Sequence, residues 1–97
     1  MHVLALRVSL YLPEARSLKA KRGLVKPIVE GARRRYRVAA SEVGHQDDWH
    51  RAELGFATVT ASVRQAEEVI GEVERFVWSS PEVEVVRADR SWLEEDR

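Results

Sequence analysis

An alternating aliphatic pattern near the N-terminus constrains the fold more than any other feature of the sequence. Every second residue from Leu4 to Leu12 is leucine or valine, whereas the positions between them carry mixed side chains. Because successive side chains of a β-strand point to opposite faces, residues 3–12 are predicted to form a central strand with one fully apolar face. A second layer must cover that face, so a two-layer fold is expected.

A helix is predicted directly after this strand. Ser17 is the predicted N-cap, and the helix is expected to run to about Arg35. Pro27 lies inside it and presses on the carbonyl of Gly23, so a local kink is expected there. The apolar positions that recur at helical spacing are Leu18, Val25, Ile28, Val29, Ala32 and Tyr36.

A second helix and three more strands complete the predicted topology. Ser62 and Gln65 have the spacing of a capping box, and an apolar stripe of helical period follows up to Val77. The additional strands are expected at residues 38–43, 51–61 and 83–88. The order β-α-β-β-α-β predicts an α+β, ferredoxin-like two-layer sandwich, with a four-stranded antiparallel sheet and both helices on one face.

Length and composition narrow the possible classes of protein. The 97 residues suit a single domain, residues 1–97, because they are too few for two cores. The chain has no cysteine, which excludes disulfides, thiolate zinc sites, iron–sulfur clusters and cysteine nucleophiles. No apolar run approaches the about 20 residues of a membrane span, and no signal-peptide pattern opens the chain. A cytoplasmic protein without a membrane partner is therefore expected.

Charge is distributed unevenly along the chain. The net charge is zero, but the segment from Arg16 to Arg37 carries +8, with Glu30 as its one acidic residue. On the first helix the basic residues fall beside the apolar stripe, where they could bind the phosphate backbone of a nucleic acid. A solvated helix face is the alternative interpretation. The residues predicted to bind nucleic acid are Lys19, Lys21, Arg22, Lys26, Arg33, Arg34 and Arg37.

Polar residues are concentrated in the predicted hairpin around residues 44–50. Its histidines and carboxylates could bind a metal ion or act as acids and bases, but no pair has a diagnostic ligand spacing, so no metal site is predicted. Turns also favour such residues for structural reasons. We expect a polar docking loop made of Glu42, His45, Gln46, Asp47, Trp49 and Arg51. Glu42 alternates with Val38 and Ala40, which should face the core. Either the strand ends before Glu42, or Glu42 pairs with Arg51 or His45.

The third predicted strand contains a partial match to the RNA-recognition motif. Gly55 and Phe56 occupy the strand that carries stacking aromatics in that motif, so Phe56 could stack on a base. Packing of Gly55, Ala57, Val59 and Ala61 against the helices would explain the pattern by itself. If those four residues face the helices, the alternate residues of the strand lie on the uncovered face of the sheet together with apolar residues of the first strand. A homodimer interface is expected there. The predicted dimer face comprises Val3, Ala5, Tyr11, Leu54 and Phe56.

Two motifs resemble those of a known family. The segment 17–22, Ser-Leu-Lys-Ala-Lys-Arg, opens the first helix, and residues 46–55, Gln-Asp-Asp-Trp-His-Arg-Ala-Glu-Leu-Gly, cross the hairpin. The chain thereby resembles the small bacterial YlxP-like proteins, a domain of unknown function, and departs from them at His50 and at Gly23 and Pro27. The resemblance implies a ferredoxin-like fold. Genes for these proteins commonly lie beside translation genes, which implies an RNA or ribosomal partner.

No enzymatic arrangement is recognisable in the sequence. It contains no phosphate-binding glycine loop, dinucleotide fingerprint or activated serine, so neither a catalytic residue nor a cofactor is predicted. The leading hypothesis is a small non-catalytic accessory protein that binds structured RNA or a ribosomal surface through the first helix. The alternative is a dimeric interaction or regulatory module with an acidic protein partner. A metal-dependent hydrolase centred on the hairpin is a third, weaker possibility.

Overall fold

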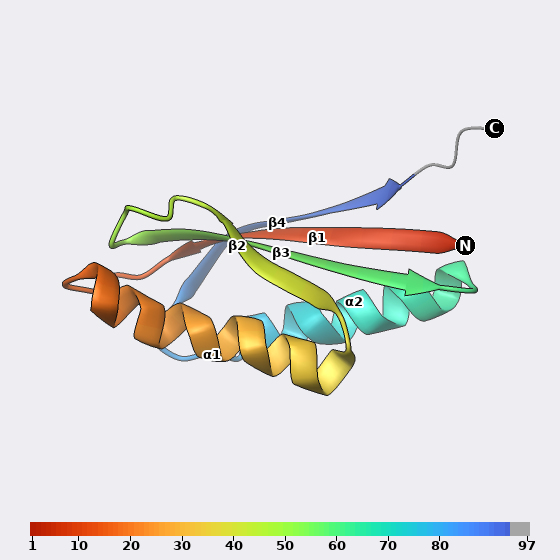
Figure 1. The fold of residues 1–97 in the computed structure, drawn as a ribbon, viewed down its shortest axis with the longest axis horizontal. Helices are drawn as coiled ribbons and strands as arrows, with labels where there is room; N and C mark the ends of the chain where they lie inside the picture. The colour runs from red at the N-terminus through yellow and green to blue at the C-terminus, as the bar shows by residue number, and fades with distance from the viewer. Residues whose placement is uncertain (94–97) are drawn as a thin grey trace.

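The described residues form a four-stranded sheet covered on one side by two helices (Figure 1). The computed structural model describes residues 1–93, so residues 94–97 of the predicted domain lie outside it. The strand order is β2-β3-β1-β4, and every pair is antiparallel, which confirms the predicted ferredoxin-like topology. In chain order the elements are β1 (His2–Tyr11), α1 (Leu18–Tyr36), β2 (Ala39–Gly44), β3 (Arg51–Thr60), α2 (Val63–Trp78) and β4 (Glu84–Leu93).

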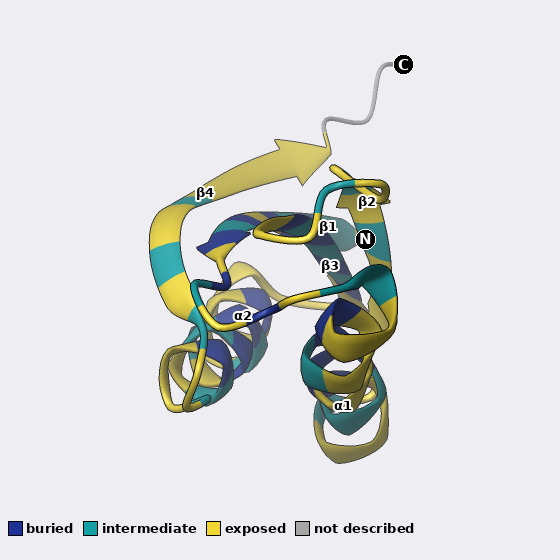
Figure 2. Cartoon of the chain, turned by 90° about the vertical axis from the view of Figure 1, so that its left-hand side faces the viewer, coloured by how far each residue is buried: buried dark blue, intermediate teal, exposed yellow. Residues whose placement is uncertain are grey.

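The core lies between the helices and the even-numbered face of β1. As the alternation predicts, this face is almost inaccessible to solvent, and Val8 at its centre is 0% exposed. The buried sides of both helices face the sheet, with α2 packed on β1 and β3 and α1 on β2 (Figure 2). From α1 and α2 the apolar residues buried against it are Val25, Ile28, Val29, Ala32, Ala66, Ile70, Val73 and Val77.

Both helices begin at the predicted caps. The Ser17 hydroxyl accepts from the Ala20 N–H at 3.0 Å, and the Ser62 hydroxyl accepts from the Gln65 N–H at 3.1 Å. Each bond satisfies one backbone donor of a first helical turn. α1 runs without interruption through Pro27. Neither of the two helices described here has the length and apolarity needed to cross a membrane.

The predicted orientation of β3 was wrong. Leu54, Phe56 and Thr58 face the helices, and both apolar residues are at most 2% exposed, whereas Val59 is 65% exposed. In the antiparallel register Leu54 lies opposite Val8 and Phe56 opposite Leu6, so each pair shares the core face. Leu54 and Phe56 therefore cannot belong to a dimer face, and Phe56 cannot stack on a base. The core needs their volume, which the small residues between them could not supply.

The fourth strand is longer than predicted. β4 extends to Leu93 rather than ending near residue 88, because it pairs with β1 as far as Val3. The register shifts between Ser9 and Leu10, and polar residues interrupt the apolar pattern. Periodicity therefore gave no sign of the second half of this edge strand. The pairing, and not the side chains, defines its length.

The orientation of β3 predicts how two substitutions affect stability. Phe56→Ala should lower the free energy of unfolding by about 3–5 kcal/mol, because it leaves a cavity in the core. Val59→Ala should lower it by about 1 kcal/mol or less, because its side chain lies on the open face, outside the core of the chain. Urea denaturation followed by circular dichroism measures both. Similar losses for the two variants would contradict the assigned face.

Candidate functional site

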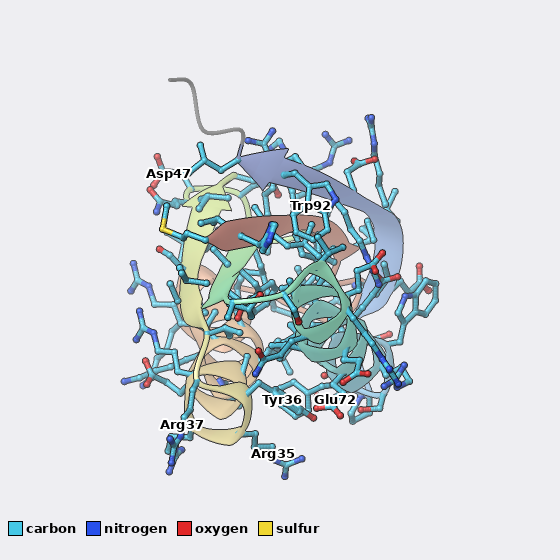
Figure 3. All side chains as sticks on the ribbon, turned by 90° about the vertical axis from the view of Figure 1, so that its right-hand side faces the viewer. Arg35, Tyr36, Arg37, Asp47, Glu72 and Trp92 are labelled. Atoms are coloured by element: carbon cyan, nitrogen blue, oxygen red, sulfur yellow. The ribbon has the colours of Figure 1, made fainter. Side chains whose placement is uncertain are left out.

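Six of the seven predicted nucleic-acid-binding residues are exposed on α1 or at its C-cap, Arg37. They run along the side of the helix away from the core, and Arg35 and Arg37 extend from the body at its C-terminal end (Figure 3). Arg35 also lies over the ring of Phe76, 5.1 Å from its centroid, which fixes part of that side chain on α2. Arg33 and Arg35 are exposed too, but both have partners within the chain. We call the remaining exposed cations the basic surface of α1: Lys19, Arg22, Lys26, Arg34 and Arg37.

A shallow hollow runs along the middle of this surface. Its volume is about 510 Å³, and Gly23 and Pro27 lie between Arg22, Lys26 and Arg34, with Glu30 also at its rim. Around Gly23 there is open space, since a Cβ atom built there would meet nothing within 4 Å. Gly23 and Pro27 thus leave a low strip between long cationic side chains.

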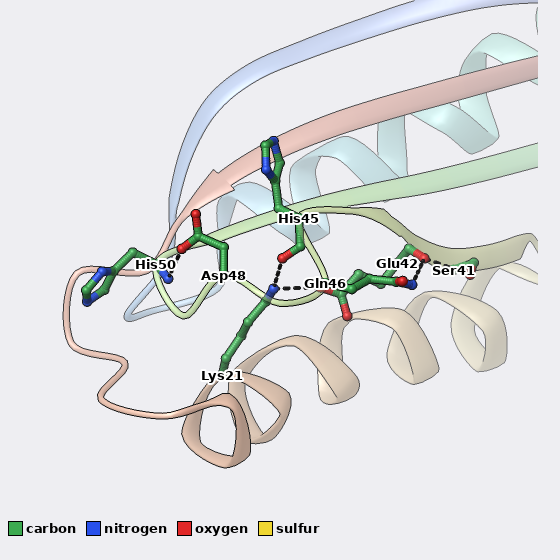
Figure 4. Close-up of polar contacts among 7 residues, drawn as sticks. All are labelled: Lys21, Ser41, Glu42, His45, Gln46, Asp48 and His50. Carbon is green, nitrogen blue, oxygen red and sulfur yellow. Dashed lines mark hydrogen bonds and ion pairs between the residues drawn. The ribbon is translucent and has the colours of Figure 1, made fainter.

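Lys21 does not belong to the basic surface of α1, contrary to the sequence prediction. It is 1% exposed, and its ammonium group lies 2.9 Å from Glu42 Oε2 and donates to the backbone oxygen of His45 (Figure 4). The contact with Glu42 is ionic rather than an aligned hydrogen bond, so Oε2 is buried without a hydrogen-bond partner. Lys21 lies four residues before Val25, on the apolar stripe, and this spacing could have revealed its burial.

Glu42 therefore faces the helix side of the sheet, as its parity predicts, but its partner is neither of the two expected residues. Arg51 and His45 were the expected partners, whereas Lys21 reaches Glu42 from the first turns of α1. A core-facing carboxylate needs a cation from the layer that covers it, and only the tertiary fold brings α1 there. The ion pair ties α1 to the end of β2 where the hairpin begins.

Arg33 is exposed, but its guanidinium is already engaged. One nitrogen pairs with Glu30 at 2.8 Å, and the other donates to the backbone oxygen of Ala40 at 2.7 Å. Ala40 lies on β2, an edge strand, so Arg33 occupies a carbonyl that would otherwise be available to another strand. Glu30, the one acidic residue of the segment, is neutralised by the same contact. We therefore leave Arg33 out of the basic surface.

The polar hairpin is organised by its own backbone contacts. Asp48 Oδ1 accepts from the His50 N–H at 2.8 Å, and the Gln46 side-chain amide donates to the Glu42 carbonyl at 3.3 Å. Among residues 1–93, no three histidine or acidic side chains gather closely enough to hold a metal ion. The predicted docking residues that are exposed are His45, Gln46, Asp47, Trp49 and Arg51.

One carboxyl group of the hairpin has a shifted pKa. The hydrogen bond from the His50 N–H lowers the pKa of Asp48 below its ordinary value of 3.8. Desolvation acts in the opposite direction, and the positive charge of Arg51 adds a smaller lowering effect. Asp48 is therefore ionised at neutral pH and acts as the acceptor that closes the turn.

Comparison with known proteins identifies the family. Residues 3–90 match the family described as "Protein of unknown function (DUF503)". The chain belongs to the DUF503 family. Over 80 residues it is 37% identical to the uncharacterized protein YlxP of Bacillus subtilis (strain 168), an alignment that covers 82% of this chain and 87% of YlxP. The resemblance carried by the two sequence motifs is thus confirmed.

Two solved structures share the fold. A de novo designed protein with a ferredoxin fold aligns with a TM-score of 0.56 at 15% identity, covering 98% of this chain and 88% of the design. A dimeric ferredoxin-like protein from an uncultured marine organism aligns over 100% of both chains with a TM-score of 0.53 at 6% identity. At these identities the similarity supports the fold alone.

The buried ion pair predicts a rescue between two substitutions. Lys21→Met should lower the free energy of unfolding by about 2–4 kcal/mol, because it leaves the Glu42 carboxylate without its cation. The double variant Lys21→Met/Glu42→Leu should recover to within about 1 kcal/mol of the wild type, since no unpaired charge remains. Urea denaturation of the two variants tests this. A double variant as unstable as the single one would show that the carboxylate is not the source of the loss.

The lowered pKa of Asp48 predicts a pH-dependent contribution to stability. Above the ordinary pKa the Asp48 carboxylate is ionised in both the folded and the unfolded chain, so its contribution to stability is complete. This contribution disappears as the pH falls through the lower pKa of the folded chain. Asp48→Ala should therefore be less stable than the wild type at neutral pH and equal to it at strongly acidic pH. Thermal unfolding across a pH series measures the difference. A carboxyl titration followed by NMR at or above pH 3.8 would contradict the assignment.

Proposed function

We propose that this DUF503 protein binds structured RNA through the basic surface of α1. The proposal rests on the cations that remain exposed once the residues with partners inside the chain are set aside. Lys21 is buried and Arg33 is held by Glu30 and Ala40, yet five cations remain in solvent along one helix. The nearest acidic group on the helix, Glu30, is already paired.

The geometry suits a phosphate backbone better than a compact ligand. The cations follow a helix of 19 residues, which spans about 28 Å at 1.5 Å per residue. The hollow between Arg22, Lys26 and Arg34 is open and shallow, and Gly23 and Pro27 also line it. Such a row can contact successive phosphates and release their condensed counterions without reading the sequence.

The hairpin provides a second contact at one end of the row. Lys21 holds the His45 carbonyl against the first turns of α1, so the loop and Lys19 belong to the same end of the molecule. Trp49 is 48% exposed in this loop and presents an indole surface on which an unpaired base could stack. The loop is thus placed to recognise structure beside the contacted backbone.

RNA affinity measured across a salt series tests the proposal. If all five cations contact phosphates, log Kd should vary with log salt with a slope of magnitude about 3.5–4.5. Arg22→Glu/Lys26→Glu should weaken binding and reduce the slope by about 2, because two phosphate contacts are lost. A folded hairpin RNA and purified ribosomal subunits are suitable ligands for fluorescence anisotropy and sedimentation, respectively.

Arg64→Glu/Arg75→Glu is the matched control. It makes the same change in net charge on exposed residues of α2, outside the basic surface. The control should bind RNA nearly as well as the wild type. Equal losses in the two double variants would indicate a general charge effect. No RNA binding by the wild type at moderate salt would overturn the proposal and favour an acidic protein as the partner of α1.

A further inference from the structure

The side of the sheet opposite the helices has two distinct halves. The register places Val3, Val59 and Leu93 next to one another at one end, followed by a row of Ala5, Ala57 and two further small residues. The other half carries charged residues. Both halves are on the exposed side of the sheet, where β4 is exposed along most of its length (Figure 2).

Small residues make the middle of this face concave. Ala5, Ala39, Gly55 and Ala57 line a hollow of about 390 Å³ in the sheet surface. Val43 leans over Gly55, since a Cβ atom added to Gly55 would lie 3.2 Å from Val43 Cγ1. An apolar floor of this kind lets another layer approach the backbone closely, and the exposed Val59 and Leu93 extend the apolar surface beside it.

The charged half is balanced in sign. Arg87 Nε lies 2.7 Å from Asp89 Oδ2 on β4, and Arg7 on β1 lies opposite Asp89. Glu53 on β3 lies opposite Ser9. A surface with equal numbers of both signs can match a second copy of itself. Its charged residues are Arg7, Arg51, Arg87, Glu53, Glu84 and Asp89.

We infer that the open face binds a second copy of this chain as a two-fold symmetric dimer. The division of the face selects the symmetry axis. An axis parallel to the strands brings the apolar half onto the apolar half, whereas an axis across the strands would bury charged residues against apolar ones. The axis then lies between β1 and β3, the central strands of the sheet, and places β1 of one copy over β3 of the other.

This geometry creates a specific charge contact. Arg7 lies opposite Gly55 in the register, so in the dimer it enters the position above Gly55 of the partner subunit. Glu53 lies two residues along the same strand and on the same face, within reach of a long arginine side chain. The contact occurs twice, once in each direction. At the other end Val3 of each copy covers Val59 of the partner subunit.

The size of the face is adequate for a stable dimer. Three strands of ten residues and one of six give about 570 Å² in projection, from about 3.3 Å per residue and 4.8 Å per strand. Side-chain relief adds to this, so the buried area approaches the about 800 Å² per partner of an ordinary specific interface. The helices remain outside, so the inference does not depend on RNA binding by α1.

The first test is the mass of the protein in solution. The wild type should sediment at twice the 11.1 kDa mass of the chain at micromolar concentration. Val59→Glu should shift it to the monomer mass, because it buries two carboxylates in the apolar half. Val63→Glu, an exposed valine at the start of α2, is the matched control and should remain dimeric. A monomeric wild type, or an unchanged dimer in Val59→Glu, would overturn the inference.

The second test uses charge exchange between two variants. Arg7→Glu alone places two carboxylates at each contact, and Glu53→Arg alone places two arginines there, so each variant should sediment as a monomer. An equimolar mixture should form a heterodimer, because both contacts then join opposite charges. A contact within one chain cannot produce this recovery. Circular dichroism confirms that both variants are folded, and a mixture that stays monomeric would refute the assigned contact.

Discussion

The central position of β1 determines the arrangement of every other element. Its even-numbered side chains are buried in the core, and its two edges are occupied by β3 and β4. Because both neighbours pair antiparallel with it, the face of each residue in those strands follows from its partner on β1. The same register that buries Leu54 and Phe56 places Ala57 and Val59 on the open face. The composition of the open face is therefore a consequence of packing on the covered one.

α1 has an exposed basic surface and a buried stripe, and one basic residue, Lys21, lies on the buried stripe. Lys21 lies within the basic segment of the sequence but on the buried stripe of the helix, where it neutralises Glu42 and holds the His45 carbonyl. A buried pair of this kind gains little net stability over apolar packing, but it fixes which groups lie together. Here it fixes the hairpin against α1. The basic surface and the polar loop thus meet at a defined place, without Lys21 itself reaching a ligand.

The two proposed surfaces lie on opposite sides of the sheet and use different physics. The basic surface of α1 depends on exposed charge, which is screened by salt and tolerates irregular partners. The open face depends on apolar area, small side chains and a matched arrangement of charges, which requires a partner of fixed shape. In a dimer formed through the open face, the two copies of α1 face away from each other. One assembly would then present two separate RNA-binding surfaces, which increases avidity for a ligand that reaches both.

The sequence by itself determined the topology, both helix caps and the basic segment, because these depend on local spacing: the alternation from Leu4 to Leu12, the serines at positions 17 and 62, and the charges around α1. It could not determine which face of β3 is buried, since alternation leaves two choices and only the register with β1 distinguishes them. It also could not give the length of β4, whose second half is held by backbone pairing. Only the tertiary structure decided that Lys21 is buried, that Glu42 is its partner and that small residues line the open face, because each of these depends on a neighbour distant in the chain.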